Sequence, residues 1–167
     1  MRRYFTADAF YQTIYYIPPD FFSEHGISAI LSDIDNTLIP YEEEEPNEHI
    51  REWLDGLAAR GIRVAVASNN HRPRVEKFNR TLGLFAVSNA AKPSRRAVKQ
   101  VLRHFGVKRE QLCLIGDQVF TDVLAAKRAG CICILVEPIR DKRDLFTRLK
   151  RYFERPFKRE FLSRGNV

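Results

Sequence analysis

ISAILSDIDNTL, residues 27–38, is an apolar run that ends in two carboxylates, Asp33 and Asp35. The run is short and rich in isoleucine, as expected for a strand buried on both faces of a sheet. On an extended strand end, alternate side chains point the same way. We therefore expect both carboxylates to face one site just beyond the strand.

Four more apolar runs follow at intervals typical of alternating strands and helices. They occupy residues 62–68, 84–88, 111–116 and 131–137. The gaps between them carry apolar residues at helical spacing, with Ser94 and Thr121 placed to cap two of the four helices. Strands that alternate with helices predict a parallel sheet with helices on both faces, so we expect a doubly wound, Rossmann-like α/β fold.

Polar side chains follow the other predicted strands as they follow the first. Ser68 and Asn69 end the second run, Lys92 comes shortly after the third, and the loop GDQVFTD supplies Asp117 and Asp122. Ligands of doubly wound sheets bind at the carboxyl ends of the strands. The sequence therefore predicts one polar site at that edge of the sheet.

DIDNTL, a serine after the second run, a lysine in AAKPS and the loop GDQVFTD together resemble the four motifs of the haloacid dehalogenase (HAD) superfamily. Each motif alone is weakly specific, but the ordered set, which spans residues 27–136, is highly specific. The resemblance implies a phosphatase in which Asp33 attacks phosphorus and briefly carries the phosphoryl group. It also implies a resident Mg²⁺ ion.

The same resemblance assigns the metal ligands. They would be Asp33, the backbone carbonyl of Asp35, and Asp117, with Asp122 supporting the metal directly or through water. A phosphate monoester is doubly negative and hydrolyses very slowly in water, so an attacking carboxylate needs a cation beside it. Mg²⁺ suits this task because it prefers hard oxygen ligands and binds phosphate.

Four groups would hold the phosphate or polarise it: Thr37, Ser68, Asn69 and Lys92. Lys92 would offset the phosphate charge and keep Asp33 ionised, while Ser68 would donate a hydrogen bond to a phosphoryl oxygen. Asn69 would contribute its backbone N–H. By the resemblance, therefore, the phosphate site draws on the first three motifs.

Asp35 decides the reaction type. It can protonate the leaving alkoxide and then deprotonate the water that breaks the aspartyl phosphate. This favours a phosphatase over the dehalogenases of the superfamily, which lack this acid. A phosphomutase would share Asp35, but the gaps before the second predicted strand and before Lys92 are too short for its cap domain. We therefore expect a capless (class III) enzyme with an open site and a large or surface-bound substrate.

DIDNTLIP, VASNNHRPRV, AAKPS, GDQVFTDVLAAKRAG and ILVEPI resemble the bacterial YqeG-type subgroup, which is related to mitochondrial phosphatidylglycerophosphate phosphatases. Lys127 departs from that pattern, where asparagine is more usual. The resemblance implies removal of the terminal phosphate from phosphatidylglycerophosphate at the membrane surface, a step of phospholipid biosynthesis. A phosphatase of a soluble small or nucleotide phosphomonoester remains an alternative, because it would need the same catalytic residues.

The two ends of the chain differ in composition from its middle, and we expect three segments. Residues 1–26 are rich in aromatic side chains, residues 27–139 form the phosphatase core, and residues 140–167 form a basic amphipathic segment. An apolar stripe flanked by Lys and Arg could lie on anionic lipid as a peripheral membrane contact. The alternative is that both ends pack on the sheet.

The sequence also supports expectations about the protein's cellular location, its partners and the redox state of its cysteines. It has neither the ~20 consecutive apolar residues of a membrane-spanning helix nor an apolar signal core, so we expect a cytoplasmic protein, with peripheral contact at the inner membrane face. An RNA-binding protein on a HAD scaffold is a further alternative, but no RNA-recognition motif accompanies the net charge of +7. Cys113, Cys131 and Cys133 lie inside apolar runs and predict reduced core thiols rather than a zinc site.

Overall fold

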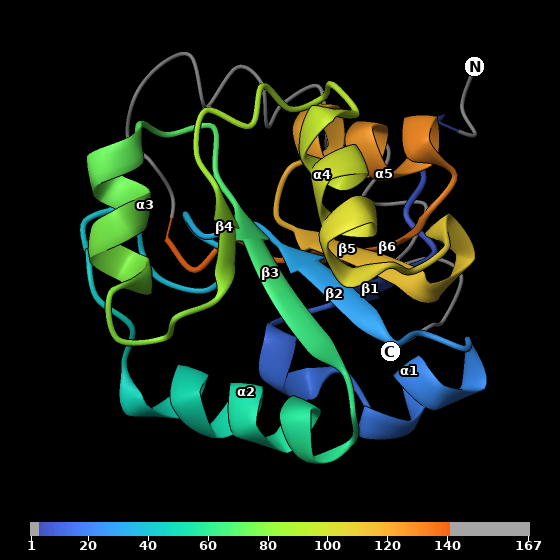
Figure 1. The fold of residues 1–167 in the computed structure, drawn as a ribbon, viewed down its shortest axis with the longest axis horizontal. Coiled ribbons are helices and arrows are strands. Elements are labelled where there is room, and N and C mark those ends of the chain that lie inside the picture. Colours follow the sequence, from blue (N-terminus) through green and yellow to red (C-terminus); the bar gives the residue numbers. More distant parts are fainter. Residues whose placement is uncertain (1–3, 141–167) are drawn as a thin grey trace.

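The computed structural model describes residues 4–140, which build a six-stranded, all-parallel β-sheet with the order β1-β6-β5-β2-β3-β4 (Figure 1). The strands are β1 (Ala9–Tyr11), β2 (Ala29–Ser32), β3 (Arg63–Ala67), β4 (Phe85–Val87), β5 (Leu112–Gly116) and β6 (Ile132–Val136). The α-helices are α1 (Pro19–Glu24), α2 (Glu48–Ala59), α3 (Arg72–Asn79), α4 (Arg96–Phe105) and α5 (Leu124–Ala129). Short 3₁₀ helices lie at η2 (Ile14–Tyr16) and η3 (Arg109–Gln111), and η4 (Val119–Val123) is a π-helical turn. The predicted doubly wound α/β fold is confirmed.

Helices cover both faces of the sheet because side chains alternate along each strand. On β2, Ile30 points to the face covered by α1, α2 and α3, where it joins a core with Phe22 and Phe78. Leu31 points to the other face, where α4 and α5 supply apolar partners such as Val101. All four residues of β2 and all five of β5 are buried. These strands therefore read in the sequence as continuous apolar runs rather than alternating ones.

The first strand was not among the predicted elements. β1 has only three residues, too few for a periodic signal, and it becomes a strand by pairing with β6, Ala9 opposite Ile134. Phe10 and Phe22 are buried, so the described part of the N-terminal segment packs on the sheet. The basic segment predicted at the C-terminus lies, from residue 141 on, outside the described residues. Within residues 4–140 no helix is long and apolar enough to cross a membrane.

One predicted helix start is wrong. Thr121 does not cap α5, because the chain first makes the π-helical turn η4, in which Thr121 is an interior residue. Across this turn, the buried carboxylate of Asp122 accepts a hydrogen bond from the backbone N–H of Gln118 at 3.1 Å. Single π-helical turns are frequent at functional sites. Ser94 lies one residue before the cap position of α4, but its hydroxyl does accept the N–H of Arg96, at 3.1 Å.

The strand order creates a crevice at the carboxyl ends of β2 and β5. The chain leaves β2 toward β3 and β4 on one side and returns with β5 and β6 on the other. In doubly wound sheets, ligands bind in the crevice that forms where two neighbouring strands are followed by connections to opposite sides of the sheet. The connections after β2, β3 and β4 contain α2, α3 and α4 and no inserted domain, in agreement with the predicted capless core. The three cysteines are buried and free, as expected.

Gly116, at the end of β5, leaves no room for a side chain. A Cβ at this position would lie 2.5 Å from the Cβ of Asp122. We expect Gly116→Ala to lower the melting temperature, because overpacking a core costs about 1–3 kcal/mol. For a domain of this size that corresponds to roughly 2–4 °C per kcal/mol, measurable by calorimetry.

Gly56→Ala is the matched control. Gly56 lies inside α2, and a Cβ there would meet no atom within 4 Å. Alanine is a better helix former than glycine by about 1 kcal/mol, so this variant should melt slightly above wild type. Equal responses of the two variants would contradict the tight approach of Asp122 to β5.

Candidate active site

A polar hollow of about 220 Å³ lies at the carboxyl edge of the sheet. Its lining residues come from the loops after four strands: Asp33, Asp35, Tyr41, Ser68, Asn69, Asn70, Lys92, Gln118 and Thr121. Five of the eight residues predicted for the site line it. The remaining three are Thr37, Asp117 and Asp122, which are buried beside the lining rather than in it.

Three buried carboxylates gather beneath the hollow. Asp33, Asp117 and Asp122 each offer an oxygen, and these oxygens lie within 4.8 Å of one another. Asp33 directly follows β2, and Asp117 and Asp122 follow β5, the strand that pairs with β2 in the sheet. Three hard oxygen donors converging on one point suit a divalent cation such as Mg²⁺ or Mn²⁺.

Lys92 is the cation that already holds part of this cluster together. Its ammonium donates to Oδ1 of Asp33 at 2.5 Å and forms an ion pair with Oδ1 of Asp122 at 2.8 Å. A third bond, at 3.1 Å, goes to the backbone carbonyl of Ala67. Burial alone lowers the pKa of Lys92, but Asp122 and Asp33 outweigh it, so the net pKa lies above its ordinary value. The lysine therefore stays charged.

The backbone of Lys92 is fixed by the side chain of Asn69. The Lys92 N–H donates to Oδ1 of Asn69 at 2.7 Å, and Nδ2 of Asn69 donates to the Lys92 carbonyl at 3.0 Å. This double hydrogen bond ties the loop after β4 to the loop after β3. The side chain of Asn69 is thus a structural clamp, while the predicted use of its backbone N–H stays a prediction.

The surroundings of Asp33 raise the pKa of its carboxyl group. Burial raises its pKa to about 7, the Lys92 ammonium works against this rise, and Asp122 and Asp35 add to it. Lys92 pairs with Asp33 and Asp122, and Arg74 pairs with Asp35. The oxygens of Asp33, Asp117 and Asp122 lie within 4.8 Å of one another, so these carboxylates repel one another when all three are ionised. A divalent cation relieves that repulsion, so the residues present fit one.

Asp35 lies in a separate environment on the other side of the hollow. Its Oδ2 accepts a hydrogen bond from the hydroxyl of Ser68 at 2.8 Å. Its Oδ1 accepts two from Arg74, at 3.2 Å from Nε and 2.8 Å from Nη2. Arg74 also donates to the backbone carbonyl of Tyr41 at 3.0 Å. Both oxygens of Asp35 are thereby held in place.

Arg74 was not predicted as a site residue. It is only 8% exposed and projects from the first turn of α3. The sequence did contain one signal for it: an arginine in a first turn that has no acidic residue opposes the helix dipole, which favours negative charge there. Such a placement suggests an anionic partner from elsewhere in the fold, here Asp35.

Two further predicted residues have defined surroundings. The hydroxyl of Ser68 accepts the N–H of Asn70 at 2.9 Å while donating to Asp35, so in this structure its proton points to the carboxylate. Thr37 is 3% exposed, and within residues 4–140 its hydroxyl has no hydrogen-bond partner. The predicted phosphate contacts of both residues stay predictions.

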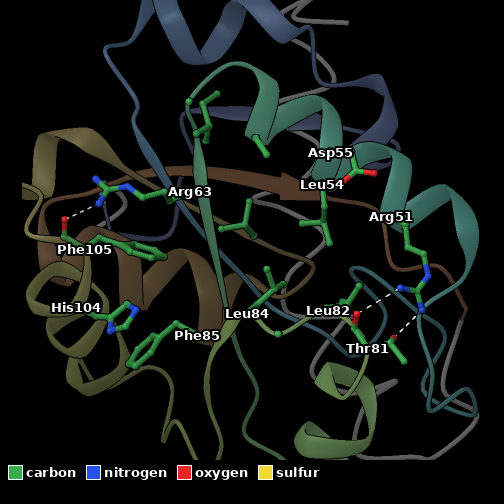
Figure 2. Close-up of a pocket in the computed structure, with 15 residues that line it drawn as sticks. Arg51, Leu54, Asp55, Arg63, Thr81, Leu82, Leu84, Phe85, His104 and Phe105 are labelled. Carbon is green, nitrogen blue, oxygen red and sulfur yellow. Dashed lines mark hydrogen bonds between the residues drawn. The ribbon is translucent and has the colours of Figure 1, made fainter.

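A larger hollow, of about 610 Å³, lies between α2, β3, β4 and the end of α4 (Figure 2). Two of its labelled polar side chains already have hydrogen-bond partners. Arg51 donates to the hydroxyl of Thr81, and Arg63 donates to the backbone carbonyl of Phe105 (Figure 2). Asp55 is the one carboxylate among its described lining residues. Convergent polar groups identify the smaller hollow as the candidate site despite its size.

Known sequences resemble this chain. A family described as haloacid dehalogenase-like hydrolase matches residues 3–130. "Probable phosphatase YqeG" of Bacillus subtilis (strain 168) is 32% identical over 167 residues, which cover all of this chain and 97% of that protein. The chloroplastic/mitochondrial phosphatidylglycerophosphate phosphatase 1 of Arabidopsis thaliana is 24% identical over 160 residues, 90% of this chain but 46% of the plant protein.

Solved structures share the fold. A hypothetical protein of Xanthomonas campestris is similar with a TM-score of 0.58 and 21% identity, covering 75% of this chain and 72% of that one. The cobalt-bound deoxy-D-mannose-octulosonate 8-phosphate phosphatase of Haemophilus influenzae has a TM-score of 0.54 and 20% identity, covering 64% of this chain and 66% of that one. These likenesses concern the fold.

We expect divalent cations to stabilise the protein, because a bound cation offsets the repulsion among the three clustered carboxylates. At 100 times its Kd, a cation that binds only the folded state adds about 2.7 kcal/mol. That should raise the melting temperature by roughly 5–10 °C for a domain of this size. Thermal shift with Mg²⁺ after chelation measures it. Asp117→Asn should abolish most of the shift, and Asp55→Asn, an exposed carboxylate on α2, should keep it.

The cation's effect should also depend on pH. Without a cation, the folded pKa of Asp33 is about 7, above its ordinary value of 3.8. The stability that this protonated carboxyl contributes is present below pH 3.8 and is lost as pH rises through 7. A cation favours the ionised form, so the Mg²⁺ shift should be larger at pH 8 than at pH 6. A shift that grows toward acid pH would contradict this account.

Proposed function

The chain belongs to the haloacid dehalogenase-like hydrolase family, and we propose that it is a phosphatase that works through a phosphoryl–Asp33 intermediate. The observation that carries the proposal is the position of Asp33, whose carboxylate accepts a hydrogen bond from Lys92 and has an oxygen within 4.8 Å of oxygens of Asp117 and Asp122. A carboxylate held against a fixed ammonium at the floor of an open hollow can act as a nucleophile toward a bound phosphate.

In the first half-reaction, a carboxylate oxygen of Asp33 attacks phosphorus and the phosphorus–oxygen bond to the leaving group breaks. Asp35, in its acid form, gives its proton to the departing oxygen. Lys92 offsets negative charge on the phosphoryl group, and the Ser68 hydroxyl and the Asn69 N–H are proposed as further donors. The products are a free alcohol and phosphoryl–Asp33.

In the second half-reaction, Asp35 accepts a proton from a water molecule as that water attacks phosphorus. The bond between phosphorus and Asp33 breaks, which frees the carboxylate and releases inorganic phosphate. Asp35 is then protonated again and ready for the next substrate. This double use requires a fixed position for Asp35, which its bonds to Arg74 and Ser68 provide.

We propose Mg²⁺ as the resident cation. Asp33, Asp117 and the backbone carbonyl of Asp35 would hold it, and once bound it neutralises phosphate charge and keeps Asp33 ionised. Asp122 fits a supporting role, because Oδ1 pairs with Lys92 at 2.8 Å and Oδ2 accepts the Gln118 N–H at 3.1 Å. Its oxygens thus already have partners within the protein.

The proposed substrate is phosphatidylglycerophosphate, which would yield phosphatidylglycerol and inorganic phosphate. The names of both curated relatives support a phosphatase, and the name of the plant relative supports this lipid. The site supports a large substrate, because residues 4–140 contain no inserted domain that could close over the hollow. A lipid headgroup presented from a bilayer could reach such a site without leaving the membrane.

The C-terminal end of the described chain lies at the rim of the site. The N–H of Ile139 donates to the carbonyl of Asn36 at 3.0 Å, and Arg140 lies 4.0 Å from a carboxylate oxygen of Glu42. The basic segment of residues 140–167 therefore begins beside the loop that carries Asp35. This placement supports a peripheral membrane contact of that segment close to the substrate.

We expect Mg²⁺-dependent phosphate release from phosphatidylglycerophosphate in mixed micelles. Asp33→Asn should lower kcat by roughly 10⁴-fold or more, the loss seen when a catalytic unit is broken. Asp55→Asn is the control with the same chemical change at an exposed site. Turnover of soluble esters alone would keep the mechanism and reject the lipid; no turnover of either would reject the proposed function.

Arg74 should act as a positioning residue for Asp35. If Asp35 protonates the leaving group, Arg74→Met should slow alkyl phosphates by roughly 10²-fold, the size of a general-acid contribution. p-Nitrophenyl phosphate should slow much less, because its leaving group needs little protonation. Arg74→Lys should restore part of the loss.

The ratio of turnover of an alkyl phosphate to turnover of p-nitrophenyl phosphate, measured in one preparation, separates a positioning role of Arg74 from simple loss of folded enzyme. Arg72→Met, an exposed arginine on the same helix, serves as the control and should leave that ratio at its wild-type value. An equal loss on both esters in Arg74→Met would mean that Arg74 stabilises the fold and has no part in proton transfer.

A further inference from the structure

Positive charge in the body of the protein is concentrated in one stretch. Residues 77–109 contain nine Lys or Arg and no Asp or Glu. Four of these cations line a shallow hollow of about 350 Å³ on the outer side of α4, together with Ser94 and Gln100: Arg95, Arg96, Lys99 and Arg103. All four are exposed, and we call this patch the α4 basic surface.

Among residues 4–140 the four cations have no acidic partners. Several other exposed cations in residues 4–140 form ion pairs, such as Arg72 with Glu76 and Arg109 with Glu110. No such pair within those residues involves a cation of the α4 basic surface. Like charges at helical spacing repel one another, so the patch opposes the stability of the free protein.

The dipole of α4 adds to the unfavourable electrostatic energy of these cations. Its first turn contains no acidic residue, and Arg95 occupies the cap position without forming a side-chain cap. Cations at the positive end of a helix dipole are unfavourable. A local departure of this kind, without an acidic partner in the part of the chain that the structure describes, is typical of a functional surface. An anionic ligand would relieve both the repulsion and the unfavourable dipole.

The α4 basic surface begins at the rim of the catalytic hollow. Lys92 lines that hollow and Ser94 lines the surface, and two residues of chain span at most about 7 Å. From there the surface follows α4 to Arg103, about 10 Å farther along the axis. The two hollows share no lining residue. The surface is therefore separate from the catalytic site but continuous with its edge.

We propose that the α4 basic surface docks the enzyme on a bilayer of anionic lipids, so that the substrate's phosphate meets the adjoining catalytic hollow. This inference rests on the proposed function, because it takes the substrate to lie in that bilayer. Guanidinium groups bind phosphate oxygens in pairs, and cations near an anionic membrane each add to binding. The contact is distinct from that proposed for residues 140–167.

A bilayer fits this surface better than a nucleic acid does. Proteins that hold single strands combine a basic groove with aromatic side chains on which bases stack. The residues that line the α4 hollow include no aromatic side chain. A bilayer, by contrast, presents many phosphates in one plane and can contact a stripe of cations and the adjacent opening together.

The test is partition of the full-length protein into vesicles, of phosphatidylcholine alone or with an equal share of phosphatidylglycerol. The α4 triple variant carries Arg96→Gln, Lys99→Gln and Arg103→Gln. Its control carries Arg60→Gln, Arg72→Gln and Arg109→Gln, three exposed cations that pair with acids elsewhere. Both variants have the same net charge and the same C-terminal segment.

Wild type and control should bind the anionic vesicles alike, and the α4 triple variant should bind on the order of 100-fold more weakly. Turnover of p-nitrophenyl phosphate should stay at its wild-type value in both variants, and the α4 triple variant should melt at or slightly above wild type, because it loses like-charge repulsion. Equal partition of the two triple variants, or no anionic-lipid binding by wild type, would overturn the inference.

Two further outcomes separate the possibilities. Oligonucleotide binding that requires the α4 cations, without vesicle binding, would overturn the inference in favour of nucleic acid. Vesicle binding through α4 by an enzyme that releases no phosphate from phosphatidylglycerophosphate would uphold the docking surface and reject the proposed lipid substrate. The two proposals can therefore fail independently.

Discussion

The buried ammonium of Lys92, set between Asp33 and Asp122, is the interaction on which the site depends. It joins the loops after β2, β4 and β5 at a point that is largely buried from solvent. A charge in such a place is costly unless it is paired, and removing one partner leaves the other uncompensated. The surrounding structure is arranged around that pair: Asn69 clamps the lysine backbone, and Gly116 leaves room for Asp122.

The site divides its acidic residues into two environments. Asp33 lies with Asp117 and Asp122 in a cluster of carboxylates whose mutual repulsion a divalent cation would relieve. Asp35 lies apart, held by Ser68 and Arg74. A proposed nucleophile must stay ionised, and a proposed acid must change protonation state twice in each cycle. Different partners for two residues in the same short motif allow both requirements to be met.

Outside the site, charge and openness point to the same kind of substrate. The acidic loop after Asp35 is tied down by Lys77 and Arg140, whereas the cations of α4 have no acidic partners within the described residues. On the side of the acidic loop, charges are therefore paired within the protein. On the side of α4, the cations are available to bind an anion. A capless hollow beside such cations is suited to a phosphate presented on a surface.

The sequence by itself determined the parallel α/β fold and the strand ends that carry Asp33, Asp35, Ser68, Lys92 and Asp117. Each of these signals is local: an apolar run makes the strand, and the polar residue that follows must lie at its end. Only the tertiary structure decided that Ala9 pairs with Ile134, that Arg74 holds Asp35, and that a π-helical turn replaces the expected cap at Thr121. Those features depend on partners brought together by folding or on how a buried carboxylate packs, and neither local periodicity nor residue preference encodes them.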